Sequence, residues 1–179
     1  MLYSSLRYCT LGPSHLDEVL ALEAEVLSEL ERPDLLRRNT VDMWRACLLP
    51  PHTALGVRVG EKLVALAVLY LPQPCDEEDL ATKLLGVETE EIKSANYKIC
   101  MVLPNYRGHG LQRLLGERLE KIAFHQGVTL LCSTVSPHNG ASITSLLRLG
   151  YRYNRTLTKY GFERNLYYKI ISTGDSAKE

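Results

Sequence analysis

The feature that most constrains the fold is a short glycine-containing turn between an apolar strand and an amphipathic helix. Residues Tyr97–Leu103 are mostly apolar and predict a strand, whereas His109–Gln126 carries apolar residues at helical spacing with charged residues between them. The intervening Pro104–Gly108 has neither pattern and predicts a loop. A strand, a tight loop and a helix in this order indicate a sheet with helices packed on it.

The segments around this unit predict further helices and strands. Helices are expected from a cap at Ser14 to about Leu30, from a cap at Asn39 or Thr40 to Leu49, around Glu77–Leu85, and from Asn139 to Leu149. Strands are expected at Ala54–Val59, Leu63–Leu71, Val128–Val135, Tyr151–Leu157 and Glu163–Ile171. This order predicts an α/β fold with an α+β mixed sheet, in one domain over residues 1–171, followed by a flexible tail over residues 172–179.

Length and charge narrow the classes of function. The 179 residues suit one ordinary domain, and 21 basic against 21 acidic residues leave no basic footprint for nucleic acid. No apolar run approaches the roughly 20 residues that span a bilayer, and the N-terminus has no apolar signal region. We therefore expect a cytoplasmic protein that binds neither nucleic acid nor a membrane.

The cysteines and histidines point away from a metal or disulfide framework. The five cysteines are widely spaced and form no C-x-x-C pair, as expected for reduced thiols that serve as small apolar residues. His109 and His138 have no second ligand at a workable spacing. No metal site is expected.

The turn between strand and helix has the composition of an anion-binding site. Gly108 and Gly110 allow positive φ and a close approach of the backbone, and Arg107 adds a cation at the start of the helix. The segment is not a G-x-x-x-x-G-K-[ST] phosphate loop, and Arg113 replaces the last glycine of a dinucleotide G-x-G-x-x-G motif. Two interpretations stand at this point: a cradle for a pyrophosphate, or a glycine turn that only begins a helix.

A second motif follows the next predicted strand. Ser136–Ser142 ends that strand and begins the helix that Gly150 closes. Asn139 has two possible roles, since its side chain can cap the helix or its amide can bind the polar part of a long cofactor.

Together these two motifs resemble the GNAT superfamily of N-acetyltransferases. Arg107–Gln112 resembles the acetyl-CoA signature [Q/R]-x-x-G-x-[G/A] of that family, and Asn139–Tyr151 resembles its Asn-x-x-Ser helix; the similarity covers Tyr97–Ile171. The resemblance implies a GNAT-like acyl-CoA N-acyltransferase fold and transfer of an acetyl group from acetyl-CoA to a primary amine, with CoA as product. The resemblance implies three groups of cofactor-binding residues. The thioester oxygen would be held by the backbone N–H groups of Met101, Val102 and Leu103. The pyrophosphate would be held by Arg107, Gly108, His109, Gly110, Leu111 and Gln112, and the pantetheine by Asn139 and Ser142.

The chain departs from the family where acid–base chemistry is concerned. Many members carry a Tyr seven residues after the motif Asn, where this chain has Leu146, and a Glu on the central strand, where this chain has Asn96 and Lys98. The general base of the reaction is therefore not assigned by the resemblance. Glu91 and Tyr160 are candidates, because each flanks an element expected near the acceptor. The alternative is a non-catalytic acyl-CoA-binding or interaction module on the same fold. The acceptor, a small-molecule or peptide amine, is not identified, and such families commonly form homodimers.

An acidic segment precedes the central strand. Residues 76–91 hold seven acidic side chains against Lys83 alone. In the resembled fold this segment lies at the acceptor side, where it would attract a cationic amine. A solvated acidic helix that aids solubility is the other interpretation.

Overall fold

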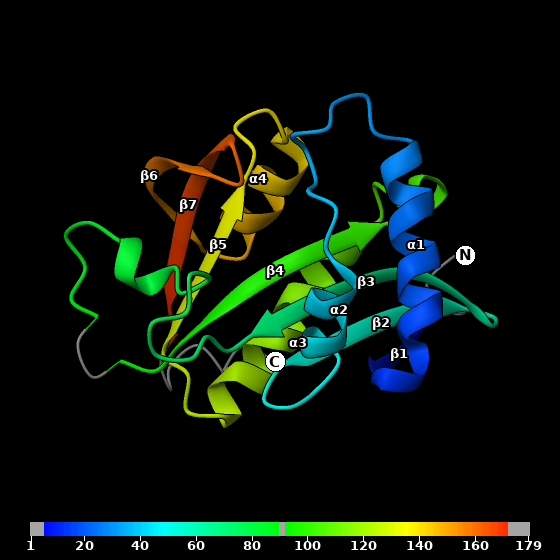
Figure 1. Ribbon diagram of the computed structural model, residues 1–179, viewed down its shortest axis with the longest axis horizontal. Coiled ribbons are helices and arrows are strands. Elements are labelled where there is room, and N and C mark those ends of the chain that lie inside the picture. The colour runs from blue at the N-terminus through cyan, green and yellow to red at the C-terminus, as the bar shows by residue number, and fades with distance from the viewer. Residues whose placement is uncertain (1–5, 90–91, 172–179) are drawn as a thin grey trace.

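A seven-stranded mixed sheet organises the described part of the chain, which in this computed structural model comprises residues 6–89 and 92–171 (Figure 1). The strand order is β1-β2-β3-β4-β5-β7-β6, and β4 and β5 are parallel whereas the other neighbours are antiparallel. The strands are β1 (Leu6–Leu11), β2 (Thr53–Val59), β3 (Lys62–Tyr70), β4 (Ser94–Val102), β5 (Leu130–Val135), β6 (Arg152–Lys159) and β7 (Phe162–Ile170). The predicted mixed-sheet fold is confirmed.

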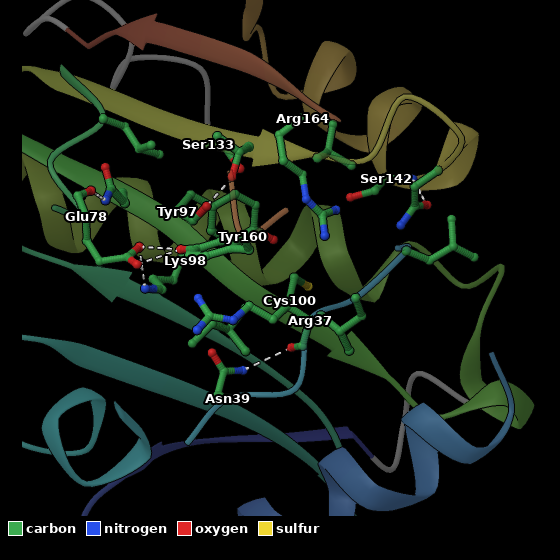
Figure 2. Close-up of a pocket in the computed structure, with 18 of the residues that line it drawn as sticks. Arg37, Asn39, Glu78, Tyr97, Lys98, Cys100, Ser133, Ser142, Tyr160 and Arg164 are labelled. Atoms are coloured by element: carbon green, nitrogen blue, oxygen red, sulfur yellow. Dashed lines mark hydrogen bonds and ion pairs between the residues drawn. The ribbon is translucent and has the colours of Figure 1, made fainter. Parts of the chain in front are cut away.

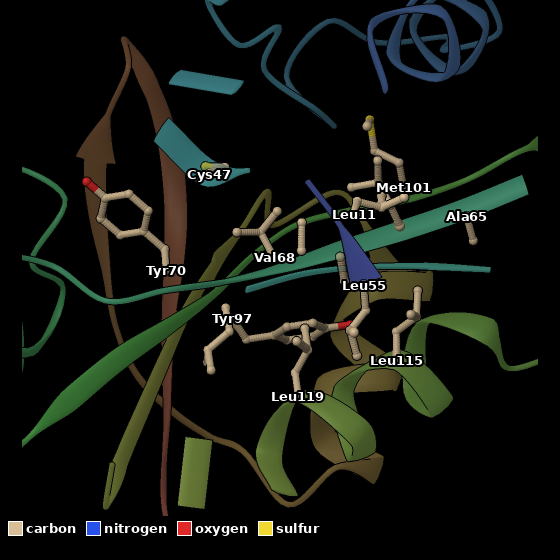
Figure 3. Packing of buried hydrophobic residues seen from close by; sticks show 14 of the residues in the cluster. Leu11, Cys47, Leu55, Ala65, Val68, Tyr70, Tyr97, Met101, Leu115 and Leu119 are labelled. Carbon is tan, nitrogen blue, oxygen red and sulfur yellow. The ribbon is translucent and has the colours of Figure 1, made fainter. Parts of the chain in front are cut away.

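Helices cover both faces of the sheet. Helix α1 (Leu16–Ser28) contacts β3 and β4 and is joined by α2 (Val41–Cys47). Helix α3 (Leu111–His125) packs on β2, β3 and β4 and contacts α4 (Gly140–Arg148). Figure 3 shows Tyr97, Leu115 and Leu119 between the sheet and α3, with Met101 on the opposite side toward α1. The two layers of helix explain why β3 is apolar nearly throughout: from Leu63 to Tyr70 it is buried on both faces.

The structure differs from the expected elements in three places. The predicted helix around Glu77–Leu85 is wrong, since only a 3-10 turn forms there, at Ala81–Lys83. The side chains of Asp76 and Asp79 accept hydrogen bonds from the backbone N–H groups of Glu78 and Ala81, and such local bonds compete with helix formation. Strand β1 was not expected from the sequence, and α1 begins only after a 3-10 turn at Pro13–His15 that contains Ser14. The predicted tail at 172–179 lies outside the described residues.

A buried carboxylate holds the connection between α1 and α2 in place. Glu23 is 4% exposed, and its oxygens accept from the Asn39 backbone N–H at 2.8 Å, the Asn39 side-chain amide at 2.9 Å and the Trp44 indole N–H at 3.0 Å. Trp44 itself is fully buried. Because these bonds join α1, α2 and the chain between them, they fix the segment that brings Arg37 to the pocket described below.

Replacing Glu23 by Ala is expected to lower the free energy of unfolding by about 2–4 kcal/mol, because the indole and amide N–H donors lose their acceptor inside the protein. Urea denaturation measures the change. The matched control is Glu25→Ala on the same helix, whose ion pair with Lys62 is about half exposed and should cost less than about 1 kcal/mol. Equal losses in the two variants would contradict a structural role for Glu23.

Candidate active site

A pocket opens where β4 and β5 separate. The two strands pair only through Ser94–Leu130, Ala95–Leu131 and Asn96–Cys132, and beyond these residues they diverge (Figure 1). In β4 the register with β3 also shifts between Lys98 and Met101, and Ile99 has a positive φ of 52°. The bulge and the divergence leave backbone and side chains of Asn96–Cys100 on the pocket wall. The other lining residues come from the α1–α2 connection, the β3–β4 connection, α3, β5, α4 and the β6–β7 hairpin (Figure 2).

The glycine turn before α3 has open space beside its backbone. Gly108 and Gly110 have φ of 79° and 72°, and a Cβ at either position would meet no atom within 4 Å. Gly110 caps α3 without any side-chain hydrogen bond, so the first N–H groups of this 15-residue helix keep no side-chain acceptor. Open backbone N–H groups at a helix start and an exposed Arg107 beside them fit a phosphate group.

The side chains of this turn differ in how far they are exposed to a ligand. Arg107 is exposed, and its Nε donates to the Val102 carbonyl at 3.2 Å, which steers the guanidinium along the end of β4. Leu111 is 2% exposed, so its side chain belongs to the core and its backbone N–H is the part that faces the turn. His109 is partly buried within the turn.

Hydrogen bonds tie the start of α3 to the start of α4. The side-chain amide of Gln112 donates to the Ser142 hydroxyl at 2.7 Å, and the Ser142 backbone N–H donates to the Asn139 side-chain oxygen at 3.1 Å. The capping role of Asn139 is therefore confirmed, while Asn139 and Ser142 also line the pocket. Gln112, where the resembled motif has a small residue, bridges the two helices.

One predicted backbone contact needs correction. The N–H of Leu103 donates to the Val64 carbonyl at 2.9 Å, so the prediction that it holds the thioester oxygen is wrong. The side chains of Met101 and Leu103 are each 1% exposed and lie in the core. For Met101 and Val102 the backbone role stays a prediction. The β4 residues on the pocket wall lie just upstream, at the bulge formed by Ile99 and Cys100.

The other end of the pocket holds a cluster around Glu78. Its carboxylate accepts from Lys98 Nζ at 2.9 Å and from the Tyr160 hydroxyl at 2.6 Å (Figure 2). It also accepts from Lys159 Nζ at 3.1 Å. Burial by itself would raise the pKa of Glu78, but the charges of Lys98 and Lys159 and the hydrogen bonds from Tyr160 and Lys98 outweigh this effect and lower that pKa to about 2. Glu78 is thus an ionised, fully engaged carboxylate at neutral pH.

Sequence reasoning counted Glu78 only as one charge of the acidic segment. The two strand positions where the family carries a carboxylate both contact it, since Lys98 pairs with its carboxylate and the Asn96 amide donates to its backbone carbonyl at 2.5 Å. The β3–β4 connection thus supplies the carboxylate that the strand lacks. No local pattern in the sequence indicates this, because residues 78 and 98 meet only through the fold.

Of the two residues predicted as general base, the structure describes only Tyr160. Tyr160 lines the pocket as expected, but its hydroxyl already donates to Glu78, and burial together with that carboxylate raises the pKa of the phenol far above its usual range. Tyr160 therefore keeps its proton at neutral pH, which argues against its prediction as a base. Glu91 lies outside the described residues.

The charge of the pocket is the reverse of that expected from the acidic segment. Among the described residues that line it, Arg37, Lys98 and Arg164 are cationic and Glu78 is the acidic side chain. Asp76 accepts from the Tyr70 hydroxyl at 2.7 Å, so part of the acidic segment serves local structure. Among the described residues of the acidic segment, only Glu78 contributes an acidic side chain to this pocket wall. Glu90 and Glu91 lie outside the described residues, so attraction of a cationic amine by the segment stays a prediction.

Leu146 does not reach the pocket. It is 1% exposed and packs in the main core cluster. The position at which the family carries a tyrosine is thus an apolar core position in this chain.

Residues 6–89 and 92–171 hold neither a candidate metal site nor a candidate membrane-spanning helix. No group of three or more His, Cys, Asp or Glu side chains there could hold a metal ion. No helix in these ranges is long and apolar enough to cross a membrane.

Comparisons with known proteins agree with this geometry. A family profile described as the acetyltransferase (GNAT) family matches residues 17–151. No curated protein matches the chain. Among solved structures, the chain is similar to the ribosomal-protein-S18-alanine N-acetyltransferase of Escherichia coli, at 18% identity and a TM-score of 0.69, over 94% of this chain and 95% of that one.

Two similar structures contain acetyl-CoA. Arabidopsis thaliana NAA60 in complex with acetyl-CoA is 15% identical with a TM-score of 0.72, over 93% of this chain and 98% of that one. The yncA protein of Salmonella typhimurium with its cofactor acetyl-CoA is 13% identical with a TM-score of 0.69, over 94% and 95%. At these identities the likeness shows the shared fold.

Proposed function

The chain belongs to the acetyltransferase (GNAT) family, and we propose that it transfers the acetyl group of acetyl-CoA to a primary amine of a small molecule or peptide. The observation that carries the proposal is the cationic pocket between β4 and β5, whose wall includes Gln112 at the start of α3, directly after the glycine turn. In the NAA60 and yncA structures this fold is found with acetyl-CoA. A reducing cytoplasm stays the predicted compartment.

The donor end is assigned from the geometry of the cradle. The turn of Arg107–Gln112 and the first N–H groups of α3 would hold the pyrophosphate. Beyond Asn96, the edge of β4 that faces β5 has no register partner among the described residues, so the pantetheine amides can bond to it as a strand would. Asn139 and Ser142 flank this path. Acetyl-CoA supplies the acetyl group as an activated thioester.

The acceptor end favours a neutral amine. Cations at Arg37, Lys98 and Arg164 disfavour an ammonium ion beside them and so lower the pKa of a bound amine. With a pKa of about 2, Glu78 is too weak a base to take the proton itself at neutral pH. The amine therefore loses its proton to solvent before attack, and Glu78 positions Lys98 and Tyr160.

The reaction is a direct displacement. The amine nitrogen attacks the thioester carbon, the new C–N bond forms, and the C–S bond breaks to release the CoA thiolate. Formation of the C–N bond leaves the nitrogen positively charged, and it then releases one proton to solvent. The CoA thiolate is protonated by solvent. Backbone N–H groups of β4 near the bulge would stabilise the oxygen on which negative charge develops.

The alternative is a non-catalytic acyl-CoA-binding or interaction module. Two observations support this alternative. Leu146 lies in the core, and neither Glu78 nor Tyr160 has a pKa suited to a general base. Loss of thioester in the presence of an amine panel separates the two functions. Because Cys75 is an exposed free thiol, the ultraviolet absorbance of the thioester is a better signal than a thiol reagent.

CoA and acetyl-CoA are expected to raise the Tm of the protein, since a ligand that binds only the native state stabilises it. Arg107→Ala should weaken CoA binding by about 1.5–3 kcal/mol, or roughly 10- to 100-fold, through loss of a charge-assisted contact. Calorimetric titration measures it. Arg148→Ala, at an exposed position on α4, is the control. Unchanged affinity in Arg107→Ala would remove the cradle assignment.

A further inference from the structure

Arg164 is a buried cation that forms no ion pair with any described residue. It lies on β7, is 5% exposed, and its side chain points into the pocket (Figure 2). Its contact of 5.8 Å with the Phe162 ring is a weak one, and no described residue forms a hydrogen bond or ion pair with its guanidinium. Buried charges in proteins are normally paired, so an unpaired one that faces a pocket indicates a missing partner.

The nearby carboxylates are committed to other groups. Asp34 accepts from Arg32 Nε at 2.9 Å and from the Ser136 hydroxyl at 2.7 Å. Glu78 is held by Lys98, Lys159 and Tyr160. Neither carboxylate is within ion-pair distance of Arg164. Burial lowers the pKa of Arg164 although the charge of nearby Asp34 opposes this, so the Arg164 charge is only partly compensated and a ligand anion can compensate it further.

A second arginine lies at the same end of the pocket. The guanidinium of Arg37 is 3.9 Å from the centre of the Tyr160 ring, which holds it in place, and no carboxylate among the described residues pairs with it. Arg37 comes from the α1–α2 connection and Arg164 from β7, so the two cations flank the cavity from different elements.

The pocket also carries an unpartnered acceptor. The side-chain oxygen of Asn96 is buried and accepts no hydrogen bond from the described residues. Asn96 lies at the point where β4 and β5 part. Because this oxygen has almost no accessible surface, it belongs to the buried wall of the pocket and is not part of the subsite argued below.

We propose, resting on the acetyl transfer argued above, that Arg164 and Arg37 form a subsite for an anionic oxygen group of the acceptor. The acceptor is then a primary amine that also carries a carboxylate or a phosphate. A guanidinium matches either anion with two parallel hydrogen bonds, and the interaction is strong where water is excluded.

The test compares amines that differ in one anionic group. The pairs are ω-amino acids against their primary amides, phosphoethanolamine against ethanolamine, and short peptides with Glu against Gln at the second position. Thioester absorbance gives the rate. We expect kcat/KM to be at least 30-fold higher for the anionic member of one class, and that class identifies the anion as carboxylate or phosphate. Equal rates within every pair would overturn the subsite and leave acetyl transfer standing.

Variants of Arg164 assign the preference to this residue. Arg164→Met should reduce kcat/KM about 100-fold for the anionic amine and less than 3-fold for its neutral partner, and Arg164→Lys should restore part of the loss. Arg152→Met, at an exposed position of the same hairpin, should change neither rate. Without ligand, Arg164→Met should unfold at the wild-type Tm or above, because an unpaired charge is removed. A preference that survives Arg164→Met would overturn the assignment.

A binding measurement separates this inference from the proposed function. Succinate and phosphate, each added with excess CoA, should raise the Tm of the wild type and of Arg152→Met but not of Arg164→Met. Absence of any rise in the wild type overturns the subsite. If no amine is acetylated and CoA does not raise the Tm, the proposed function is contradicted. In that case the Tm rise with succinate or phosphate still tests the anion subsite by itself.

Discussion

Replacing Glu78 by Gln is expected to lower the free energy of unfolding at pH 7 by about 3 kcal/mol. The substitution leaves Lys98 and Lys159, whose side chains are 13% and 10% exposed, without their counter-charge. Breaking a buried ion pair from one side commonly costs about 3–5 kcal/mol. A pKa of about 2 for Glu78, against 4.5 as its ordinary value, corresponds to a similar free energy. Urea denaturation measures the difference.

The same cluster predicts a pH dependence with a definite sign. Because the folded state lowers the pKa of Glu78, this carboxylate stabilises the protein above about pH 5, and the contribution is lost as the pH falls toward 2. In Glu78→Gln the contribution is absent at every pH. The free energy of unfolding of the variant should therefore fall less between pH 5 and pH 2 than that of the wild type.

Glu77→Gln is the matched control for both measurements. Glu77 is the exposed neighbour of Glu78, and its substitution removes the same charge from the same connection. It should change the free energy of unfolding by less than about 0.5 kcal/mol and leave the pH dependence unaltered. If both variants behave alike, the cluster around Glu78 does not contribute to stability as described.

Gly110→Val is expected to weaken CoA binding by more than 100-fold. A Cβ at this position meets nothing within 4 Å in the ligand-free chain, so the new side chain occupies the space that a phosphate needs. The positive φ of 72° also disfavours a β-branched residue and would move the first N–H groups of α3 away from the ligand. Calorimetric titration with CoA gives the affinity.

Gly60→Val separates the lost binding from backbone strain. Gly60 lies in the turn between β2 and β3, has a φ of 59°, and would also place its Cβ in open space. Both variants should lose a comparable amount of stability through strain, on the order of 1–3 kcal/mol, whereas Gly60→Val should bind CoA as the wild type does. Comparable CoA affinities in the two valine variants would contradict the cradle.

The sequence alone determined the features that depend on neighbouring residues. The glycine turn before α3, the Asn139 cap, the hairpins and the apolar β3 follow from local backbone preference and from hydrophobic pattern, and the structure confirms them. Strand β1 was missed because it is a short edge strand with mixed exposure and pairs with β2 alone. The helix around Glu77–Leu85 was wrongly expected because the turns made by Asp76 and Asp79 compete with helical bonds.

Only the tertiary structure decided the acceptor end of the pocket. Glu78, Lys98, Tyr160 and Arg164 are spread over 87 positions of the chain and share no local motif. They meet because β4 and β5 diverge after Asn96 and because the β6–β7 hairpin folds beside that gap. Whether a charge is paired depends on distances between remote segments, which residue order does not contain. For this reason the acidic segment suggested an attraction for cations, whereas the folded pocket is lined by Arg37 and Arg164, which form no ion pair with a described residue, and by Lys98, which is paired with Glu78.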